Sequence, residues 1–280
     1  MLCRHRRPPK QQGKVISVTQ PTSLPRFTFV VTYGRSGSTL VQGLLNTLPG
    51  ALVRGENNLF VLPLFRSWAL LRGYHRRYGK LAGERGVQSA FYGIDEVSAD
   101  AYAESARELV MRQLYGSADP STVEVLGFKE VAWHRVRPKE SPAFFNFLDM
   151  AFPDARYVLH RRAHEDVTKS GFWRREDPDS ADLALQRVET MQDRLRETRP
   201  GRTHDTRYER LTSDDPGVVE AELRGLAEFV LGACDEPLLA RMRETLSVGF
   251  GPKPFGGSKR TGGKRGGQRS QRAEGERSSG

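Results

Sequence analysis

The sequence predicts an α/β fold in which one parallel sheet is flanked by helices on both faces. Short runs rich in β-branched and aromatic residues alternate with longer segments whose apolar residues recur at helical spacing. Strands that alternate with helices are joined by crossover connections, which place neighbouring strands parallel. The 280 residues contain no internal repeat and suit one core. In such a sheet we expect the ligand site beyond the carboxyl ends of the strands.

The predicted elements follow this alternation along the chain. The segment 27–32 (FTFVVT) is a strand, and the loop YGRSGS leads from it into a helix that carries its leucines on one face. Further strands are predicted at 123–128, 155–160 and 202–208. Further helices are predicted at 100–115, 143–152, 164–173, 181–198 and 216–231. The last helix has Asp215 as N-cap and Pro216 at its first position.

The net charge of +10 comes from the two ends of the chain. Residues 1–14 hold five basic and no acidic side chains, and residues 256–280 hold seven basic and two acidic ones. We therefore predict a neutral folded domain at 26–250 between two basic, disordered segments at 1–25 and 251–280. Such tails can touch polyanions non-specifically, but they do not predict a specific nucleic-acid partner.

Cysteine usage and hydropathy predict the compartment. The only cysteines are Cys3 and Cys234, and Cys3 falls in the predicted tail, so we expect no structural disulfide. The basic start is not followed by a signal-like apolar run, and no stretch of about 18 apolar residues is present. The expectation is a cytoplasmic protein without a membrane span.

The most specific motif is TYGRSGSTL at 32–40, where a strand passes through a glycine-containing loop into a helix. Unpaired N–H groups and the dipole at a helix start attract an anion. Glycines permit close approach, hydroxyls add donors, and an arginine adds fixed charge. No lysine follows Gly37, so this is not a Walker A loop. The alternative is a plain helix start capped by Ser38. The candidate phosphate-binding residues are Gly34, Arg35, Ser36, Gly37, Ser38 and Thr39.

This segment resembles the 5′-phosphosulfate loop of sulfotransferases, which use 3′-phosphoadenosine 5′-phosphosulfate (PAPS). Golgi carbohydrate and protein-tyrosine members of that family carry Arg-Ser-Gly-[ST]-[ST], which matches 35–39 here. The resemblance implies a P-loop-like fold in a single domain, with PAPS as co-substrate. It also implies that residues 35–39 hold the 5′ phosphosulfate.

A second segment, ARYVLHRRAHEDVTKSGFW at 155–173, resembles the family's 3′-phosphate motif. In that motif an arginine ends a strand and a serine follows eight positions later, as Arg162 and Ser170 do. We expect Ser170 about two turns into the following helix, where it could reach the same phosphate. Arg161 with Lys169 is an alternative register, and a solvated basic helix start is another. The family usually has Asp-Pro or Asn-Pro after the arginine, whereas this chain has Ala-His.

A third segment, RYERLTSDDPGVVEAELRGLAEFVLG at 207–232, resembles the family's Tyr-Glu-x-Leu stretch. By that likeness Tyr208 would lie near the adenine. The alternative is a core tyrosine at a strand end. Three such segments in the family's order make a chance resemblance improbable.

Sulfuryl transfer is an in-line displacement that needs positioning, charge neutralisation and removal of the acceptor's proton. Arg35 is placed to stabilise charge on the bridging oxygen. Glu56 matches the general base of protein-tyrosine sulfotransferases, and burial could raise its pKa to suit that role. Lys129 resembles a family lysine that stabilises the transferring group. A solvent-facing Glu56, an ion pair of Lys129 with Glu130 or another acid, and His134 as the base remain alternatives.

The predicted function is transfer of a sulfuryl group from PAPS to an acceptor hydroxyl, which releases adenosine 3′,5′-bisphosphate (PAP). The acceptor could be a carbohydrate, a lipid or a small metabolite, and the sequence specifies neither the acceptor nor an oligomeric state. No cluster with metal-ligand spacing is present, so we expect no metal. An ATP-dependent small-molecule kinase and an RNA-binding protein that uses the basic tail are the alternatives.

Overall fold

A computed structural model describes residues 23–247 of the chain. The predicted tails, 1–25 and 251–280, lie outside the described residues except for 23–25, as do Cys3 and the predicted domain boundary at 250. Within the described part Cys234 is a free thiol. Residues 23–247 contain no helix whose length and apolar content would let it cross a bilayer.

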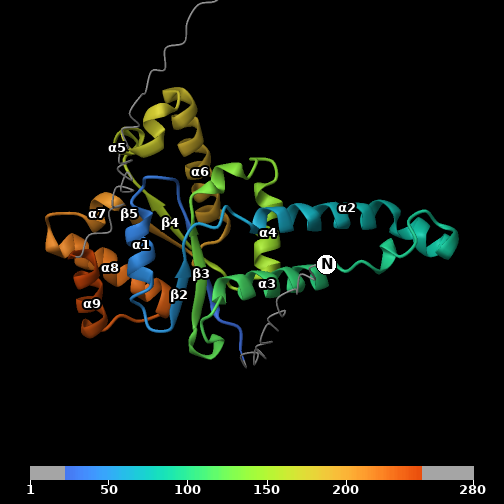
Figure 1. The fold of residues 1–280 in the computed structure, drawn as a ribbon, viewed down its shortest axis with the longest axis horizontal. Coiled ribbons are helices and arrows are strands. Elements are labelled where there is room, and N and C mark those ends of the chain that lie inside the picture. The colour runs from blue at the N-terminus through green and yellow to red at the C-terminus, as the bar shows by residue number, and fades with distance from the viewer. Residues whose placement is uncertain (1–22, 248–280) are drawn as a thin grey trace, which may run out of the picture.

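The centre of the fold is a five-stranded sheet with the order β2-β3-β1-β4-β5. All of its strand pairs are parallel, and Phe29 of β1 lies beside Phe128 of β3 and Tyr157 of β4 (Figure 1). The strands are β1 (Arg26–Val31), β2 (Ala51–Arg54), β3 (Val125–Glu130), β4 (Arg156–Arg161) and β5 (Thr203–Arg207). Because β1 is central, the loop that follows it lies at the middle of the sheet's carboxyl edge.

Helices cover both faces of this sheet. The longer ones are α1 (Ser38–Leu45), α2 (Val61–Arg85), α3 (Ala99–Tyr115), α4 (Ser141–Ala151), α6 (Pro178–Thr198), α8 (Pro216–Leu231) and α9 (Glu236–Ser247). Shorter pieces are α5 (His164–Thr168) and α7 (Tyr208–Leu211), with 3₁₀ turns at Gly86–Gln88, Ile94–Glu96, Pro120–Thr122, Ala132–Arg135 and Gly171–Arg175. This arrangement confirms the predicted α/β class with helices on both faces.

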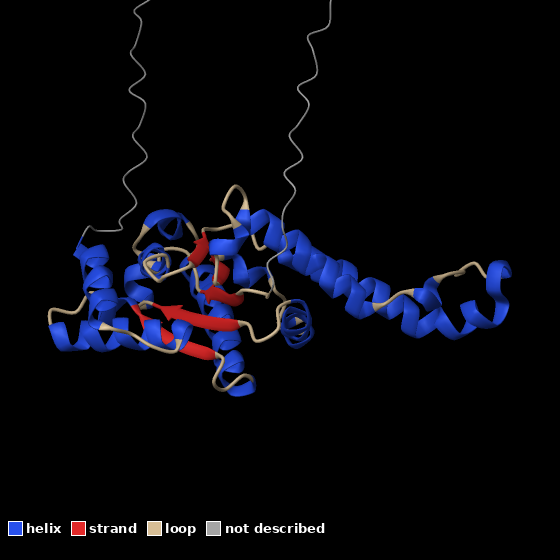
Figure 2. Ribbon diagram, turned by 90° about the horizontal axis from the view of Figure 1, so that it is seen from below, coloured by secondary structure: helices blue, strands red, loops and turns tan. Residues whose placement is uncertain are grey.

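Side-chain alternation along the strands divides the core into two clusters. Phe29 and Tyr157 point to the face that α3, α4, α6 and the start of α2 cover. Val30 and Val158, the next residues along each strand, point to the face that α1, α8 and α9 cover. The helix after β1 therefore lies on one face, and the helices after its neighbours β3 and β4 lie on the other (Figures 1 and 2). In parallel sheets ligands bind outside the carboxyl ends of the strands where such a reversal occurs, and here it occurs at β1.

Several predicted elements need correction. The helix predicted at 164–173 is interrupted: α5 ends at Thr168, and a 3₁₀ turn begins at Gly171. The predicted strands at 123–128 and 155–160 lie one or two residues further along the chain, as β3 and β4. The sequence analysis did not assign β2, α2 or α9. Strand β2 has only four residues, and α2 projects from the body over much of its length, so neither shows a simple apolar pattern (Figures 1 and 2).

Gly127 is the tightest point of the sheet. A Cβ at this position of β3 would overlap the backbone carbonyl oxygen of Thr28 on β1. We predict that Gly127→Ala lowers the free energy of unfolding by at least about 3 kcal/mol, because a backbone group cannot move aside as a side chain can. Urea unfolding measures this change.

Gly73 provides the matched control in α2. A Cβ there would meet no atom within 4 Å. Gly73→Ala should therefore raise the free energy of unfolding by about 0.5–1 kcal/mol, the helix-propensity difference. Equal effects of the two substitutions would show that Gly127 is not sterically required.

Candidate functional site

The loop after β1 forms a tight turn into the start of α1. Arg35 and Gly37 both have left-handed backbone conformations, with φ of 69° and 84°. The helix begins at Ser38, and Leu40 N donates to the Gly37 carbonyl at 2.9 Å. The first N–H groups of an α-helix have no intrahelical acceptor, so the start of α1 offers donors that could bind an anion at the carboxyl edge of the sheet.

A buried hydrogen-bond chain supports this loop from below. Ser36 Oγ lies 2.8 Å from Thr32 Oγ1, and His160 Nε2 donates to the Ser36 carbonyl at 2.9 Å. Thr206 Oγ1 donates to His160 Nδ1 at 2.8 Å. All four residues are buried. The hydroxyl of Ser36 therefore faces the interior, contrary to our expectation that it would add a donor for the ligand.

Two aromatic side chains join this loop to the second motif. Trp173 Nε1 donates to the Gly34 carbonyl at 2.9 Å. The Tyr33 hydroxyl accepts a hydrogen bond from Arg162 N at 3.0 Å and lies 2.9 Å from Glu189 Oε1. Burial raises the pKa of Tyr33 above its ordinary value, so this hydroxyl stays protonated and can donate.

The second motif meets the loop at Arg35. Arg35 Nε donates to Ser170 Oγ at 2.8 Å, and Arg162 Nη1 donates to the Arg35 carbonyl at 3.4 Å. Ser170 does not lie within a helix as expected; it follows α5 and precedes the 3₁₀ turn that begins at Gly171. Gly171 has a φ of 61°, and a Cβ there would lie 2.8 Å from Arg35 Cδ. This left-handed turn brings Ser170 to the loop.

Tyr208 brings the third motif to the same place. The Arg162 guanidinium carbon lies 4.1 Å from the centre of the Tyr208 ring. The ring also covers Gly37, because a Cβ on that glycine would overlap ring carbons of Tyr208. Tyr208 is partly exposed at the start of α7, so it is not a core tyrosine.

The alternative register, Arg161 with Lys169, is not assembled. Arg161 Nε donates to Gln192 Oε1 at 2.7 Å, and its guanidinium pairs with Asp193, both on α6. Lys169 is mostly exposed and lies 3.7 Å from Glu165. The geometry therefore favours Arg162 with Ser170.

The remaining candidates, Glu56 and Lys129, contact each other. Lys129 Nζ lies 2.6 Å from Glu56 Oε1. The Lys129 side chain is 5% exposed, whereas that of Glu56 is 53% exposed. The ion pair expected as the alternative role of Lys129 is thus present, with Glu56 as the acid. The burial that we expected for a base is not seen at Glu56. Within residues 23–247 no hydrogen bond or ion pair joins this pair to Arg35 or Arg162.

His134, the alternative base, lies on the 3₁₀ turn after β3. Partial burial, with a smaller effect of the Arg135 charge, lowers the pKa of His134 below its ordinary value. In the described part of the chain no hydrogen bond links its ring to Glu56 or Lys129. The adjacent Trp133 is a core residue that donates through Nε1 to the Val30 carbonyl at 3.2 Å.

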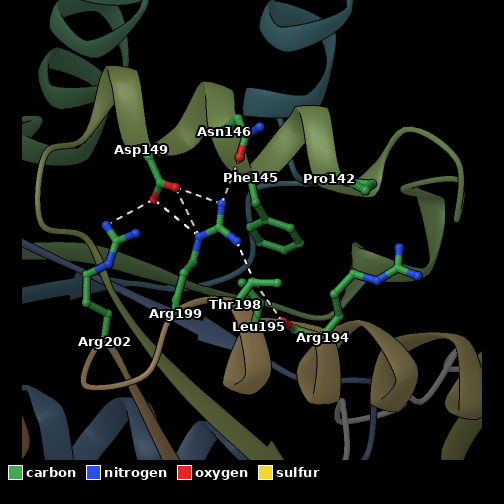
Figure 3. Close-up of a pocket in the computed structure, with 9 residues that line it drawn as sticks. All are labelled: Pro142, Phe145, Asn146, Asp149, Arg194, Leu195, Thr198, Arg199 and Arg202. Atoms are coloured by element: carbon green, nitrogen blue, oxygen red, sulfur yellow. Dashed lines mark hydrogen bonds and ion pairs between the residues drawn. The ribbon is translucent and has the colours of Figure 1, made fainter.

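A separate cavity of about 230 Å³ lies between α4 and α6. Figure 3 shows Asp149 between Arg199 and Arg202, with Phe145 and Leu195 nearby. Asp149 Oδ2 accepts from Arg199 Nη2 at 2.7 Å, and Oδ1 lies 3.1 Å from Arg202 Nη1. These ion pairs tie α4 to the end of α6. Among the described residues no group of three or more His, Cys, Asp or Glu side chains could hold a metal ion.

A parallel sheet whose central strand ends in a glycine-containing loop at a helix start is typical of proteins that bind nucleotides or phosphate groups. A family model described as the sulfotransferase family matches residues 28–229. The match covers most of the chain, and the protein therefore belongs to the sulfotransferase family.

Two solved structures are similar to this chain. The sulfotransferase domain from the curacin biosynthetic pathway shares 20% sequence identity with a TM-score of 0.47, and the alignment covers 78% of each chain. The sulfotransferase domain from the Synechococcus PCC 7002 olefin synthase shares 18% identity with a TM-score of 0.47 and covers 84% of this chain and 83% of that one. A comparison with curated proteins found no match.

Sequence reasoning missed the supporting residues Tyr33, His160 and Glu130. Tyr33 and His160 lie within motifs that were noted for their arginines, and Glu130 was considered only as a partner for Lys129. A polar residue at the end of a predicted apolar strand, or just after it, is the signal that could have found His160 and Glu130.

His160 should make the loop's support sensitive to acid. Burial lowers the pKa of His160 to about 4, whereas an unfolded histidine titrates near 6.5. The unfolded state binds more protons between these values, so the stabilisation is complete above pH 6.5 and is lost as the pH falls toward 4. Between about pH 7.5 and about pH 4.5 the loss should be about 2–3 kcal/mol.

The control is His160→Gln, because a glutamine amide can donate to Ser36 and accept from Thr206 without titrating. Urea unfolding at both pH values should show a smaller acid-induced loss in the variant than in the original protein. Identical losses would mean that His160 does not titrate on unfolding.

Proposed function

We propose that this sulfotransferase uses PAPS as donor and a hydroxyl group as acceptor, and that PAP is the second product. The observation that best supports this proposal is that residues of the loop at 32–40 and of the segments 155–173 and 207–232 contact one another. Arg35 bonds Ser170, Arg162 bonds the Arg35 carbonyl, and Arg162 lies over Tyr208, which also covers Gly37. We further propose 26–250 as the extent of the catalytic domain.

The residues at this point suit a nucleotide with two phosphate groups. Arg162 Nε is buried and has no hydrogen-bond partner within the described residues. A buried guanidinium N–H without a partner is costly, and a phosphate oxygen would satisfy it. Ser170 adds a hydroxyl that contacts Arg35, and Tyr208 offers an aromatic ring against which an adenine could pack. The start of α1, with Ser38 and Thr39, supplies N–H groups for the other phosphate.

The proposed catalytic roles rest on the family resemblance, and the positions of the charged side chains support them. Arg35 is held at the loop and would stabilise the charge that develops on the bridging oxygen when the sulfur–oxygen bond breaks. Glu56 would accept the proton of the attacking hydroxyl, and Lys129 would neutralise the sulfuryl oxygens. The 2.6 Å contact between Lys129 and Glu56 supports a shared acceptor-side site, since it keeps base and cation together. No specific observation favours a kinase or an RNA-binding protein.

The donor is tested by thermal unfolding with nucleotide. PAP should raise the melting temperature, because a ligand that binds only the folded state stabilises it by mass action. Magnesium-ATP at the same concentration should leave the melting temperature unchanged. A shift with ATP and none with PAP would contradict the proposed donor. Transfer of labelled sulfate from PAPS into a metabolite extract, followed by mass spectrometry, would then identify the acceptor.

Arg162→Ala should weaken PAP binding by about 1.5–3 kcal/mol, which is the contribution of a hydrogen bond to a charged group. The matched control is Arg161→Ala, because the neighbouring arginine contacts α6 instead. Calorimetric titration with PAP measures both variants. Weaker binding in the control and not in Arg162→Ala would restore the alternative register.

Arg35→Ala should lower the rate of sulfate transfer at least about 10²-fold, the scale of losing one preorganised charge-stabilising group. Glu56→Gln should lower this rate while PAP affinity stays unchanged. His134→Ala is the comparison variant. A larger rate loss in His134→Ala than in Glu56→Gln would assign the base to His134.

A further inference from the structure

Glu130, the last residue of β3, carries a buried carboxylate held by backbone groups. The residue is 1% exposed. Its Oε2 accepts from Asn57 N at 3.0 Å and Leu59 N at 2.7 Å. Its Oε1 accepts from Val131 N at 2.7 Å and Ala132 N at 2.9 Å. No ion pair to Glu130 exists among residues 23–247, so these four N–H groups offset the cost of burying its charge.

Two of these bonds hold a strained loop. Asn58 and Leu59 have φ of 63° and 51°, a conformation that L-residues avoid and that is unusual for a side chain as large as leucine. Such backbone conformations persist only where the surrounding structure imposes them, and they often occur at functional sites. The Asn57 side chain does not impose this one, since both of its polar atoms are buried without a hydrogen-bond partner in the described structure. The bonds to Glu130 on either side of Asn58 do, and Arg135 Nη1 also donates to Asn58 Oδ1.

The same loop begins with Glu56. Lys129 and Glu130 are consecutive strand residues, so their side chains leave the sheet on opposite sides. Lys129 holds the Glu56 side chain, while Glu130 holds the backbone of the next residue and of Leu59. The end of β3 therefore holds this loop both through a side chain, Glu56, and through its backbone. Since the Glu56 side chain is half exposed, its position depends on the backbone that carries it.

We infer that Glu130 is a positioning residue for the acceptor side of the reaction: its carboxylate fixes the strained 57–59 backbone and thereby places the Glu56 carboxylate beside Lys129. The inference rests on the proposed function for its catalytic consequence. The hold of Glu130 on the 57–59 backbone does not depend on that function, because hydrogen exchange of the loop measures it without turnover.

The first test is Glu130→Gln, followed by hydrogen exchange and by sulfate transfer from labelled PAPS into a metabolite extract. A glutamine keeps one acceptor oxygen but presents an NH₂ group to two backbone donors. Exchange should rise at 56–60 and stay unchanged at 34–40. Transfer should fall about 10- to 100-fold, because a small misplacement of a catalytic group has effects of this size. PAP affinity should stay unchanged.

The matched control is Glu140→Gln at the start of α4. Glu140 is another largely buried carboxylate, and it accepts from Arg66 Nη2 at 2.6 Å and from Arg137 N at 3.0 Å. This variant should leave exchange at 56–60 and the transfer rate unchanged.

A second variant separates positioning from a general loss of stability. Asn58→Gly removes the left-handed penalty at an exposed position and also the bond that Arg135 Nη1 donates to Asn58 Oδ1. In the Glu130→Gln background it should restore part of the transfer rate, and Asn58→Gly alone measures the effect of losing the Arg135 bond. Faster exchange at 56–60 with full transfer activity in Glu130→Gln would overturn the positioning role. Unchanged exchange at 56–60 in Glu130→Gln would show that Glu130 does not hold the loop backbone. A wild-type protein that neither binds PAP nor transfers sulfate would contradict the proposed function instead, and the exchange result would still decide whether Glu130 holds the loop.

Discussion

The loop between β1 and α1 depends on one neutral imidazole beneath it. His160 donates to the Ser36 carbonyl and accepts from Thr206, so β4 links a loop that follows β1 to the neighbouring strand β5. Burial keeps this ring uncharged, which lets one nitrogen donate while the other accepts. A cation here would place a second donor against the Thr206 hydroxyl and a positive charge inside the core. The loop at the start of α1 is therefore held from the core by a hydrogen-bonded side chain that carries no charge.

Above this support, side chains from three segments of the chain contact one another: Arg35 from the loop, Arg162 and Ser170 from the segment after β4, and Tyr208 from the start of α7 after β5. Arg162 and Ser170 reach Arg35 because the chain leaves β4, forms one short helix and reverses at Gly171. Tyr208 reaches Gly37 because β5 is the neighbour of β4 and ends at the same edge. Parallel pairing explains this convergence: in a parallel sheet every strand delivers its next residue to one edge.

The sequence was most informative where function and local geometry coincide. The strand, loop and helix around Arg35 are predicted in the right order, because an apolar strand, glycine and hydroxyl residues, and an apolar helix follow one another directly in the sequence. The resemblance to the family's 3′-phosphate motif predicts that Arg162 and Ser170 serve one phosphate, and in the structure both contact Arg35. The predicted path between them is a continuous helix, whereas the chain uses a break and a left-handed glycine. The direction of the Ser36 hydroxyl could not be read from the sequence, since it depends on Thr32 and on the buried His160. Helix α2 is not predicted because its middle part is not buried, and apolar residues there such as Leu70 and Tyr74 are exposed. Its apolar residues are therefore not confined to one face.

The contact between Glu56 and Lys129 depends on the register between β2 and β3, which no local sequence motif specifies. These residues are 73 positions apart, and nothing local joins them. Once Arg54 of β2 is paired with Phe128 of β3, however, the next residues of both strands must emerge side by side. In the proposed site, the nucleotide side therefore follows the central strand β1 and its neighbour β4. The acceptor side follows the four-residue edge strand β2 and includes the loop that Glu130 holds. An edge strand can shift without disturbing the centre of a sheet. In the proposed function this division places the acceptor side on an edge strand, apart from the central strand that carries the donor loop.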